Sequence, residues 1–534
     1  MDENHTVEIL DSTLRDGAQS EGISFSVHDK IAIVKALDEL GVRYIEAGNP
    51  GSNPKDMEFF HEMKKVPLRT ATLCAFGATR RKGISCAEDV NVQNLLTADT
   101  SVVVIFGKSW RFQVSEILQT TPEENCAMIR ETCEFLVQNG RTVIYDAEHF
   151  FTGFFDDRDY ALLTLQAALD GGATVLTLCE TQGGTLLDEC REAVATVSAR
   201  FAAHATIGIH THNDSGLAVA NSLIAVTNGA RHVQGTLLGF GERTGNANLS
   251  TIIPDLELKM KYRCLPPGNS ALLTPVVKRV AEIANVAVHQ QMPYVGSSAF
   301  AHKAGMHIDA VLKNPNAYEH VTPEQVGNER VFLMSEVAGR SMIIEKIQKF
   351  APSVTKDDPL VKEIIGQMKT LEFEGYQFEG ADGSFELLVR KIIGKYQPFF
   401  TLHYYQTNGV NPRPETGVNC CAQIKVEVDG QIEVTAGEGN GPVNALDIAL
   451  RKALVRFYPA VSRIHLTDYK VRVLDGTSAT AARVRVLVDS TDGTDSWTTV
   501  GVSADVIEAS WLALVDSFEY KLIKDIETRF RKLV

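Results

Sequence analysis

The first half of the chain repeats one pattern eight times: a short β-branched apolar run, a polar loop and a segment with helical periodicity. Helical patterns include residues 28–40, 122–138, 160–170 and 217–227. The predicted strands are residues 7–12, 44–48, 70–76, 101–107, 142–148, 174–180, 206–212 and 232–239. Eight such units are typical of a parallel (β/α)8 TIM barrel, whereas an open doubly wound sheet rarely has as many. We therefore predict an α/β chain whose barrel occupies residues 1–265.

Two further regions are predicted after the barrel. Residues 271–405 have mostly helical patterns with loops, and they are predicted to form an accessory region that follows the barrel. A stretch rich in Pro, Gly and Asn at 406–419 marks a second boundary. Residues 418–534 are predicted to form a pseudo-duplicated α+β domain, of a kind that can hold a small effector between its halves. Its expected strands and helices are 422–428, 431–436, 443–457, 465–473, 481–488, 497–502 and 506–530.

Charge and composition narrow the possible partners and location. Asp and Glu number 67 against 52 Lys and Arg, which gives a net charge of −15 and makes nucleic acid an unexpected partner. No apolar run is long enough to span a bilayer, and the polar start leads directly into a predicted strand, so we expect a cytoplasmic protein. The nine cysteines have no C-x-x-C spacing, which favours buried reduced thiols over disulfides or a thiolate zinc site.

Unusual polar residues gather at three predicted strand ends, where a TIM barrel builds its active site. His210 and His212 lie two positions apart in a strand, so both imidazoles project from the same face. Asp16 offers an anionic oxygen and Asn246 a neutral one. This set suits a divalent ion, Mn²⁺ or Mg²⁺ first and Zn²⁺ or Co²⁺ next. The two histidines alone are more often ordinary hydrogen-bonded residues, and Asp16 shifts the balance toward a metal site.

Three other side chains at the predicted barrel mouth have two interpretations each. Arg15 can bind a carbonyl or carboxylate oxygen, or form a salt bridge. Glu148 can move protons or order a water, or pair with an arginine. Thr181 can donate to a substrate carboxylate, or cap a helix.

Four segments together resemble the family of isopropylmalate, homocitrate and citramalate synthases, whose barrel belongs to a metal-dependent lyase and synthase superfamily. These segments are residues 11–19, 210–214, 239–247 and 296–307. The resemblance covers nearly the whole chain and is specific because the segments occur in combination. Residues 50–56, 146–151 and 371–390 are most similar to the longer citramalate synthases. The resemblance predicts an aromatic residue before Pro50, where this chain has Asn49.

The resemblance implies a condensation of acetyl-CoA with pyruvate to give citramalate and CoA, within isoleucine biosynthesis. It implies acid–base or water-activating roles for Glu148, His307 and Tyr318, without deciding which group takes the proton. Arg15, Asp16, Gln19 and Thr181 would bind substrate. The family also implies a homodimer that exchanges the accessory region, and an amino-acid effector, Ile or Leu, on the C-terminal domain.

Three alternatives stay open from the sequence. The first is 2-isopropylmalate synthase or another synthase of the family, which would use 2-oxoisovalerate or a different keto acid with the same barrel. The second is a lyase or decarboxylase that cleaves carbon–carbon bonds. The third is a non-catalytic amino-acid sensor on a relic barrel, against which the intact Asp16, His210 and His212 argue.

Overall fold

The computed structural model describes two compact units. One consists of Met1–Phe300 and Glu319–Arg330, and the other of Ala301–Tyr318 and Val331–Val534. The described residues are 5–332, 344, 347–348, 350–352, 354–355, 358–378, 380–412, 415, 417–474 and 482–533. Much of the predicted accessory region between 333 and 357 lies outside these residues, as does residue 481 at the start of a predicted strand. The predicted division into three domains stays a prediction.

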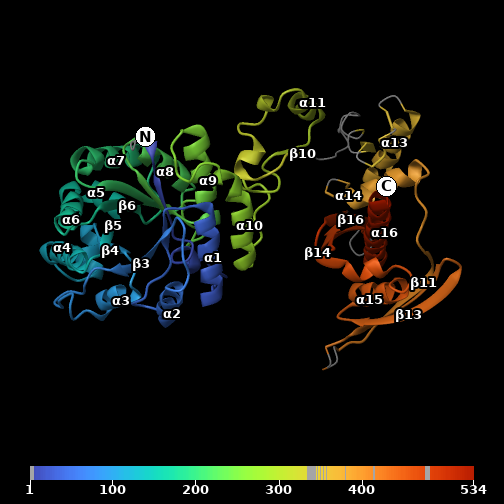
Figure 1. Ribbon diagram of the computed structural model, residues 1–534, viewed down its shortest axis with the longest axis horizontal. Helices are drawn as coiled ribbons and strands as arrows, with labels where there is room; N and C mark the ends of the chain where they lie inside the picture. Colours follow the sequence, from blue (N-terminus) through green and yellow to red (C-terminus); the bar gives the residue numbers. More distant parts are fainter. Residues whose placement is uncertain are drawn as a thin grey trace. The chain divides into compact units, whose positions relative to one another are not determined.

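Eight parallel strands close into a barrel in sequence order, so that β8 pairs with β1 (Figure 1). The predicted (β/α)8 fold is therefore confirmed. The strands are β1 (Glu8–Asp11), β2 (Tyr44–Glu46), β3 (Thr72–Ala78), β4 (Val102–Lys108), β5 (Thr142–Glu148), β6 (Val175–Glu180), β7 (Thr206–Thr211) and β8 (His232–Gly235).

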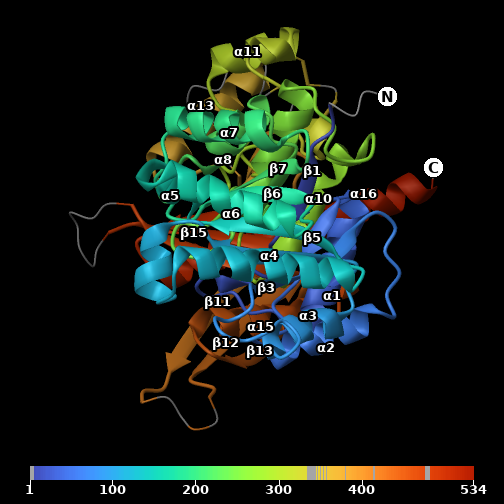
Figure 2. The same cartoon turned by 90° about the vertical axis from the view of Figure 1, so that its left-hand side faces the viewer.

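Helices follow the strands and cover the outside of the barrel, as α4, α6 and α7 do in Figure 2. Sequence signals set their ends: Ser26 and Asp29 form a capping box at the start of α1, and Gly41 ends that helix with φ 93°. The barrel helices are α1 (Val27–Leu40), α2 (Pro54–Met63), α3 (Val90–Ala98), α4 (Pro122–Gln138), α5 (Phe150–Asp156), α6 (Arg158–Asp170), α7 (Leu187–Phe201), α8 (Ala218–Thr227) and α9 (Leu249–Pro254).

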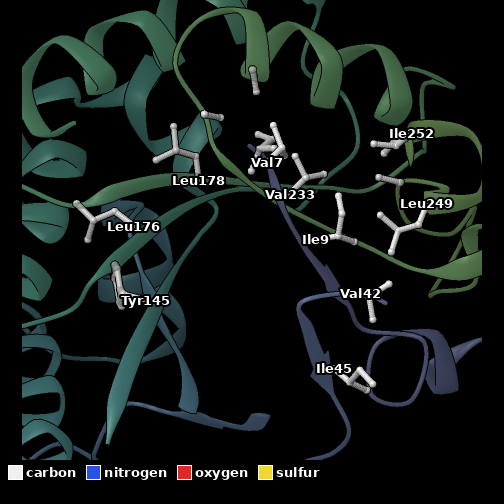
Figure 3. Close-up of a cluster of buried hydrophobic side chains, with 14 of the residues drawn as sticks. Val7, Ile9, Val42, Ile45, Tyr145, Leu176, Leu178, Val233, Leu249 and Ile252 are labelled. Carbon is white, nitrogen blue, oxygen red and sulfur yellow. The ribbon is translucent and has the colours of Figure 1, made fainter. Parts of the chain in front are cut away.

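Alternation along the strands produces two apolar layers. Val7 and Ile9 of the β1 segment belong to the large core that joins the strands to the helices, part of which Figure 3 shows. Leu10, which follows Ile9 and points to the opposite face, belongs to a separate cluster with Val104 and Ile144. Because side chains from several strands fill this second cluster, the barrel is a packed scaffold for the residues at its strand ends.

Four strands end earlier than the sequence predicts: the first ends at Asp11 and the second at Glu46, where ends at 12 and 48 were predicted. The seventh, predicted to reach residue 212, ends at Thr211, and the eighth, predicted to reach 239, ends at Gly235. A short 3-10 turn at Leu237–Gly239 follows β8, and both Leu238 and Gly239 have positive φ there, at 63° and 73°. Such angles cannot continue an extended strand, and they turn the chain into the polar loop that contains Asn246.

The barrel unit continues beyond residue 265. Helix α10 (Leu273–Ile283) packs on α1, and Arg279 forms an ion pair of 2.7 Å with Glu39 of that helix. The turn at Pro323–Val326 returns to the same core, where Thr274 Oγ1 donates to the carbonyl of Val326 at 2.7 Å.

The second unit begins with the short parallel pair β9 (Ala301–His302) and β10 (Val331–Phe332). Its helices include α11 (Gly305–Lys313), α13 (Pro359–Phe373) and α14 (Asp382–Ile392). Two three-stranded antiparallel sheets follow, each packed against a helix: β11–β12–β13 against α15, and β14–β15–β16 against α16. These elements are β11 (Thr401–Gly409), β12 (Cys420–Val428), β13 (Gln431–Gly439), α15 (Pro442–Leu454), β14 (His465–Val473), β15 (Val484–Thr491), β16 (Ser496–Ser503) and α16 (Val506–Leu533).

The sequence analysis missed β11, which overlaps the predicted boundary at 406–419. The strand alternates only weakly in burial, and it is held mainly by antiparallel pairing with β12, from Thr401 opposite Glu427 to Gly409 opposite Cys420. Such pairing between distant residues leaves little signal in the strand's own composition. Among the described residues, no helix is long and apolar enough to cross a membrane.

Gly153 of α5 is expected to tolerate no side chain, because a Cβ there would lie 2.2 Å from the carbonyl oxygen of Ser109. We expect Gly153→Ala to lower the free energy of unfolding by about 1–3 kcal/mol, as overpacking usually does. Gly184→Ala is the matched control, since a Cβ at Gly184 meets nothing within 4 Å. Equal urea midpoints for the two variants would contradict this account of the contact between α5 and the loop after β4.

Candidate active site

Asp16, His210 and His212 lie together at the carboxyl end of the barrel strands. Asp16 follows β1, His210 lies near the end of β7, and His212 comes directly after it. One potential ligand atom from each lies within 4.8 Å of the others, the only such His, Cys, Asp or Glu group among the described residues. His210 Nε2 is 3.4 Å and His212 Nε2 is 3.9 Å from Asp16 Oδ2. All three side chains are buried.

Charge in this cluster is distributed so that the carboxylate is ionised. Burial raises the pKa of Asp16, but Arg15, His210 and His212 outweigh it and hold the pKa well below its ordinary value. Burial lowers the pKa of His210, but the hydrogen bond and charge of Asp16 raise it above the usual value. Burial and the neighbouring His210 lower the pKa of His212 to about 4. A neutral His212 beside an ionised Asp16 is the state that a metal ligand set requires.

Asn246 supplies an unused oxygen next to this cluster. Its backbone bridges to that of His212, and its Nδ2 donates to the carbonyl of Phe240 at 3.0 Å. Its Oδ1 is buried, with no hydrogen-bond partner in the described part of the chain. A buried orphaned carbonyl oxygen is costly unless a ligand satisfies it. Gly241 makes this arrangement possible, since a Cβ there would lie 2.2 Å from Asn246 Nδ2.

Arg15 is fixed by a carboxylate that the sequence analysis missed. Arg15 Nε donates to Glu46 Oε2 at 2.6 Å, and its Nη1 lies 3.3 Å from Asp16 Oδ2. The guanidinium stacks on the ring of Phe76, 3.7 Å from the centroid. Glu46 is fully buried at the end of β2 and also accepts from Ser12 Oγ. The only local signal for Glu46 was a carboxylate that ends a short apolar strand.

Glu148 and Thr181 lie at the ends of neighbouring strands. Glu148 Oε2 is 2.5 Å from the ammonium of Lys108, so the carboxylate pairs with a lysine rather than the arginine that the sequence analysis considered. Thr181 Oγ1 accepts from the backbone N–H of His149 at 2.9 Å. Because a hydroxyl that accepts one bond still has its own hydrogen, Thr181 can donate to a bound oxygen.

Arg15, Glu148, Thr181 and the Asp16, His210 and His212 cluster line one cavity of about 210 Å³. Asp146 also lines this cavity, and its pKa is raised to about 7 by burial and by the charge of Glu46. Sequence reasoning did not single out Asp146, although it lies two residues before Glu148. The cavity is lined by Arg15, Asp16, Gln19, Phe76, Phe106, Asp146, Glu148, Cys179, Thr181, His210, His212, Glu242 and Arg243.

His307 and Tyr318 belong to the second unit rather than to the barrel unit. Their rings pack against each other with centroids 4.2 Å apart and an interplanar angle of 30°. About half of the Tyr318 side chain is exposed. The structure therefore brings the two residues together with each other, and their action on the barrel site stays a prediction.

The C-terminal unit has a cavity of its own, of about 580 Å³. Asp447 and Arg451 on α15 line it, with Arg451 Nε donating to Asp447 Oδ2 at 2.8 Å. Asp447 Oδ1 is buried without a hydrogen-bond partner among the described residues. The remaining lining residues are Val443, Asn444, Ser462, Ile464, His465, Leu466 and Tyr469. A small molecule with an ammonium group would satisfy the free oxygen of Asp447.

The Asp16, His210 and His212 cluster is expected to bind a divalent cation. We expect His212→Ala to weaken Mn²⁺ binding by more than about 100-fold, because loss of an outer partner alone commonly costs about 10- to 100-fold. Calorimetric titration of the metal-free full-length chain measures this. His204→Ala is the control, since His204 is exposed and outside the cluster. Unchanged Mn²⁺ affinity in His212→Ala would contradict the predicted ligand set.

Comparisons with known proteins agree along the chain. An HMGL-like family model matches residues 6–268, a homocitrate synthase post-HMGL domain-like model residues 294–375, and a LeuA allosteric (dimerisation) domain model residues 379–522. The (R)-citramalate synthase of Aquifex aeolicus is 50% identical over 98% of both chains. Those of Synechocystis sp. and Geobacter sulfurreducens are each 48% identical, over 96% and 98% of both chains. With this identity over nearly its whole length, the chain belongs to the (R)-citramalate synthase family.

Proposed function

We propose that this chain condenses acetyl-CoA with pyruvate and water to give citramalate, CoA and a proton. The observation that carries the proposal is the cavity in which Arg15 lies beside the Asp16, His210 and His212 cluster, in a chain of this family. Membership of the family makes the chain an enzyme of the transferase class rather than an amino-acid sensor on a relic barrel.

The donor set fits a divalent metal, with Mn²⁺ or Mg²⁺ first and Zn²⁺ or Co²⁺ as alternatives. Asp16, His210 and His212 would hold it, with Asn246 Oδ1 as a neutral oxygen that otherwise lacks a partner. When bound, such a metal acts as a Lewis acid that polarises a keto carbonyl and neutralises the charge that develops on its oxygen.

Arg15 and Thr181 are the groups that would hold the keto acid. Glu46 and Phe76 fix the Arg15 guanidinium before substrate binds, so its N–H groups need little reorganisation to face a developing oxyanion. Thr181 keeps a hydroxyl hydrogen for the keto-acid carboxylate. Gln19 adds an amide to the wall of the same cavity. These residues would orient pyruvate so that one face of its carbonyl is open to attack.

The reaction also needs a base for an acetyl methyl proton and a group that activates water to hydrolyse the citramalyl thioester. Glu148 is the candidate within the barrel cavity, since Lys108 holds Oε2 and leaves Oε1 to accept a proton. His307 and Tyr318, which pack against each other, are the candidates from the second unit. In a homodimer that exchanges this region, these two residues would come from the partner subunit.

The LeuA-type domain supports a dimer regulated by an amino-acid end product. Isoleucine is the effector we propose, with leucine as the alternative. The cavity beside α15 suits it: Asp447 Oδ1 can accept from the α-ammonium group, and Val443, Ile464 and Leu466 can contact an aliphatic side chain.

A panel of keto acids tests the acceptor. We expect release of free CoA, detected with a thiol reagent, to be fastest with pyruvate and at least about tenfold slower with 2-oxoisovalerate, which corresponds to roughly 1.4 kcal/mol of discrimination. Reactions without keto acid give the background hydrolysis of acetyl-CoA. Thiol release with 2-oxoisovalerate alone would instead support 2-isopropylmalate synthase. Cleavage of a 3-hydroxyacyl thioester without any condensation would support a lyase.

The effector site is tested by direct binding. We expect Asp447→Asn to weaken isoleucine binding by about 10- to 100-fold, the usual loss for a hydrogen bond to a charged group. Calorimetric titration of the full-length chain with isoleucine, and then with leucine, measures this. Asp468→Asn removes a carboxylate of the same unit that pairs with Lys470 and does not line the cavity. Equal isoleucine affinity in both variants would contradict the assignment of the cavity.

A further inference from the structure

The amide of Gln234 lies inside the barrel, between a proposed metal ligand and a buried carboxyl group. Gln234 is on β8, directly opposite His210 in the register with β7, and it is fully buried. Its Oε1 is 3.1 Å from His210 Nδ1, and its Nε2 donates to Asp146 Oδ1 at 2.8 Å. Neither the motifs in the sequence nor the proposed reaction accounts for this glutamine.

The neighbours of Gln234 fix which way its amide points. Besides Asp146 Oδ1, the hydroxyl oxygen of Thr177 accepts from Gln234 Nε2 at 3.2 Å. With Asp146 ionised, the opposite orientation would set the amide oxygen against a carboxylate oxygen, and two acceptors repel. The amide nitrogen therefore faces Asp146 and Thr177, and the amide oxygen faces His210.

This orientation determines the tautomer of His210. An amide oxygen can only accept, so His210 must carry its hydrogen on Nδ1. The other ring nitrogen, Nε2, lies 3.4 Å from Asp16 Oδ2, and in the neutral ring it carries the lone pair that a metal ligand needs. A hydrogen bond of this kind also orients the ring of a metal-ligating histidine and makes the ligand more basic.

We propose that Gln234 is a positioning residue for the metal centre. It holds His210 in the Nδ1–H tautomer with Nε2 turned toward the Asp16 and His212 side of the site, and Asp146 acts through it by fixing the amide. The inference rests on the proposed function, because it requires the metal centre described there.

The side chains on the amide-nitrogen side of Gln234 are closely packed. Gly208 of β7 has no room for a side chain, since a Cβ would lie 2.7 Å from Thr177 Oγ1 and 3.1 Å from His232 Cδ2. His232, fully buried on β8, lies on the amide-nitrogen side, with its Nε2 3.5 Å from Gln234 Nε2. Because the barrel interior is close-packed, the amide is held by both shape and hydrogen bonds.

The first test is Mn²⁺ titration of the metal-free full-length Gln234→Leu variant. Leucine has a similar volume but cannot accept from His210 Nδ1, so we expect Mn²⁺ affinity to fall about 10- to 100-fold. Asn221→Leu is the matched control, because it removes another nearly fully buried amide of the barrel unit, one that donates to the carbonyl of Thr185 and contacts none of the proposed ligands. The control should bind Mn²⁺ as the parent does, and thermal melting confirms that both variants fold.

The second test exchanges the amide of Gln234 and the carboxyl group of Asp146, which reverses the direction of the hydrogen bond between them. In the double variant Gln234→Glu with Asp146→Asn, the new carboxylate can accept from both His210 Nδ1 and the new amide. We expect Mn²⁺ affinity to return to within about threefold of the parent. Gln234→Glu alone places two carboxyl groups against each other and should bind Mn²⁺ more weakly than the double variant. A merely structural glutamine would not produce this rescue.

The outcomes separate this inference from the proposed function. If the parent chain binds no Mn²⁺, or if His212→Ala binds it equally well, the metal centre is wrong and this inference is overturned with it. If the parent binds Mn²⁺ through His212 and Gln234→Leu binds equally well, only the role of Gln234 is overturned. If Gln234→Leu does not fold, the double variant decides: recovery supports the role, and a tenfold or greater loss overturns it.

Discussion

The burial of ionised groups at the barrel mouth is the constraint on which the rest of the site depends. Asp16 and Glu46 are both buried, and Arg15 contacts both. Buried charges are costly unless their partners surround them with good geometry. Arg15 therefore cannot move without taking its guanidinium away from two buried carboxylates. A substrate that enters the cavity meets a guanidinium and an anionic cluster whose positions are already set, which is the preorganisation that stabilises developing charge.

The closed sheet provides the rigidity that this arrangement needs. Apolar side chains pack both between the strands and helices and in a second cluster with Leu10, so the strand ends are held by the core rather than by loops alone. The register between β7 and β8 then places Gln234 opposite His210. The hydrogen bond between the two side chains limits movement of the imidazole. The cluster is thus supported by a buried amide that does not itself line the cavity.

Local sequence signals predicted much of this structure, and contacts between distant residues explain what they missed. The eightfold repeat of strand and helix patterns predicted the barrel. His210 and His212, together with Asp16, predicted a cluster that the fold brings together. The sequence did not reveal Glu46, Lys108 or Gln234, because each matters through a partner more than twenty residues away. Strand β11 was missed for the same reason, since pairing with β12 stabilises it.

The central claim is that Asp16, His210 and His212 share one divalent cation in the cavity that contains Arg15. The most direct measurement is an anomalous difference map from crystals of the full-length chain grown with Mn²⁺. The account predicts one strong peak within bonding distance of Asp16 and of both imidazole Nε2 atoms. A peak bound by other residues, or no peak at these three side chains, would contradict it.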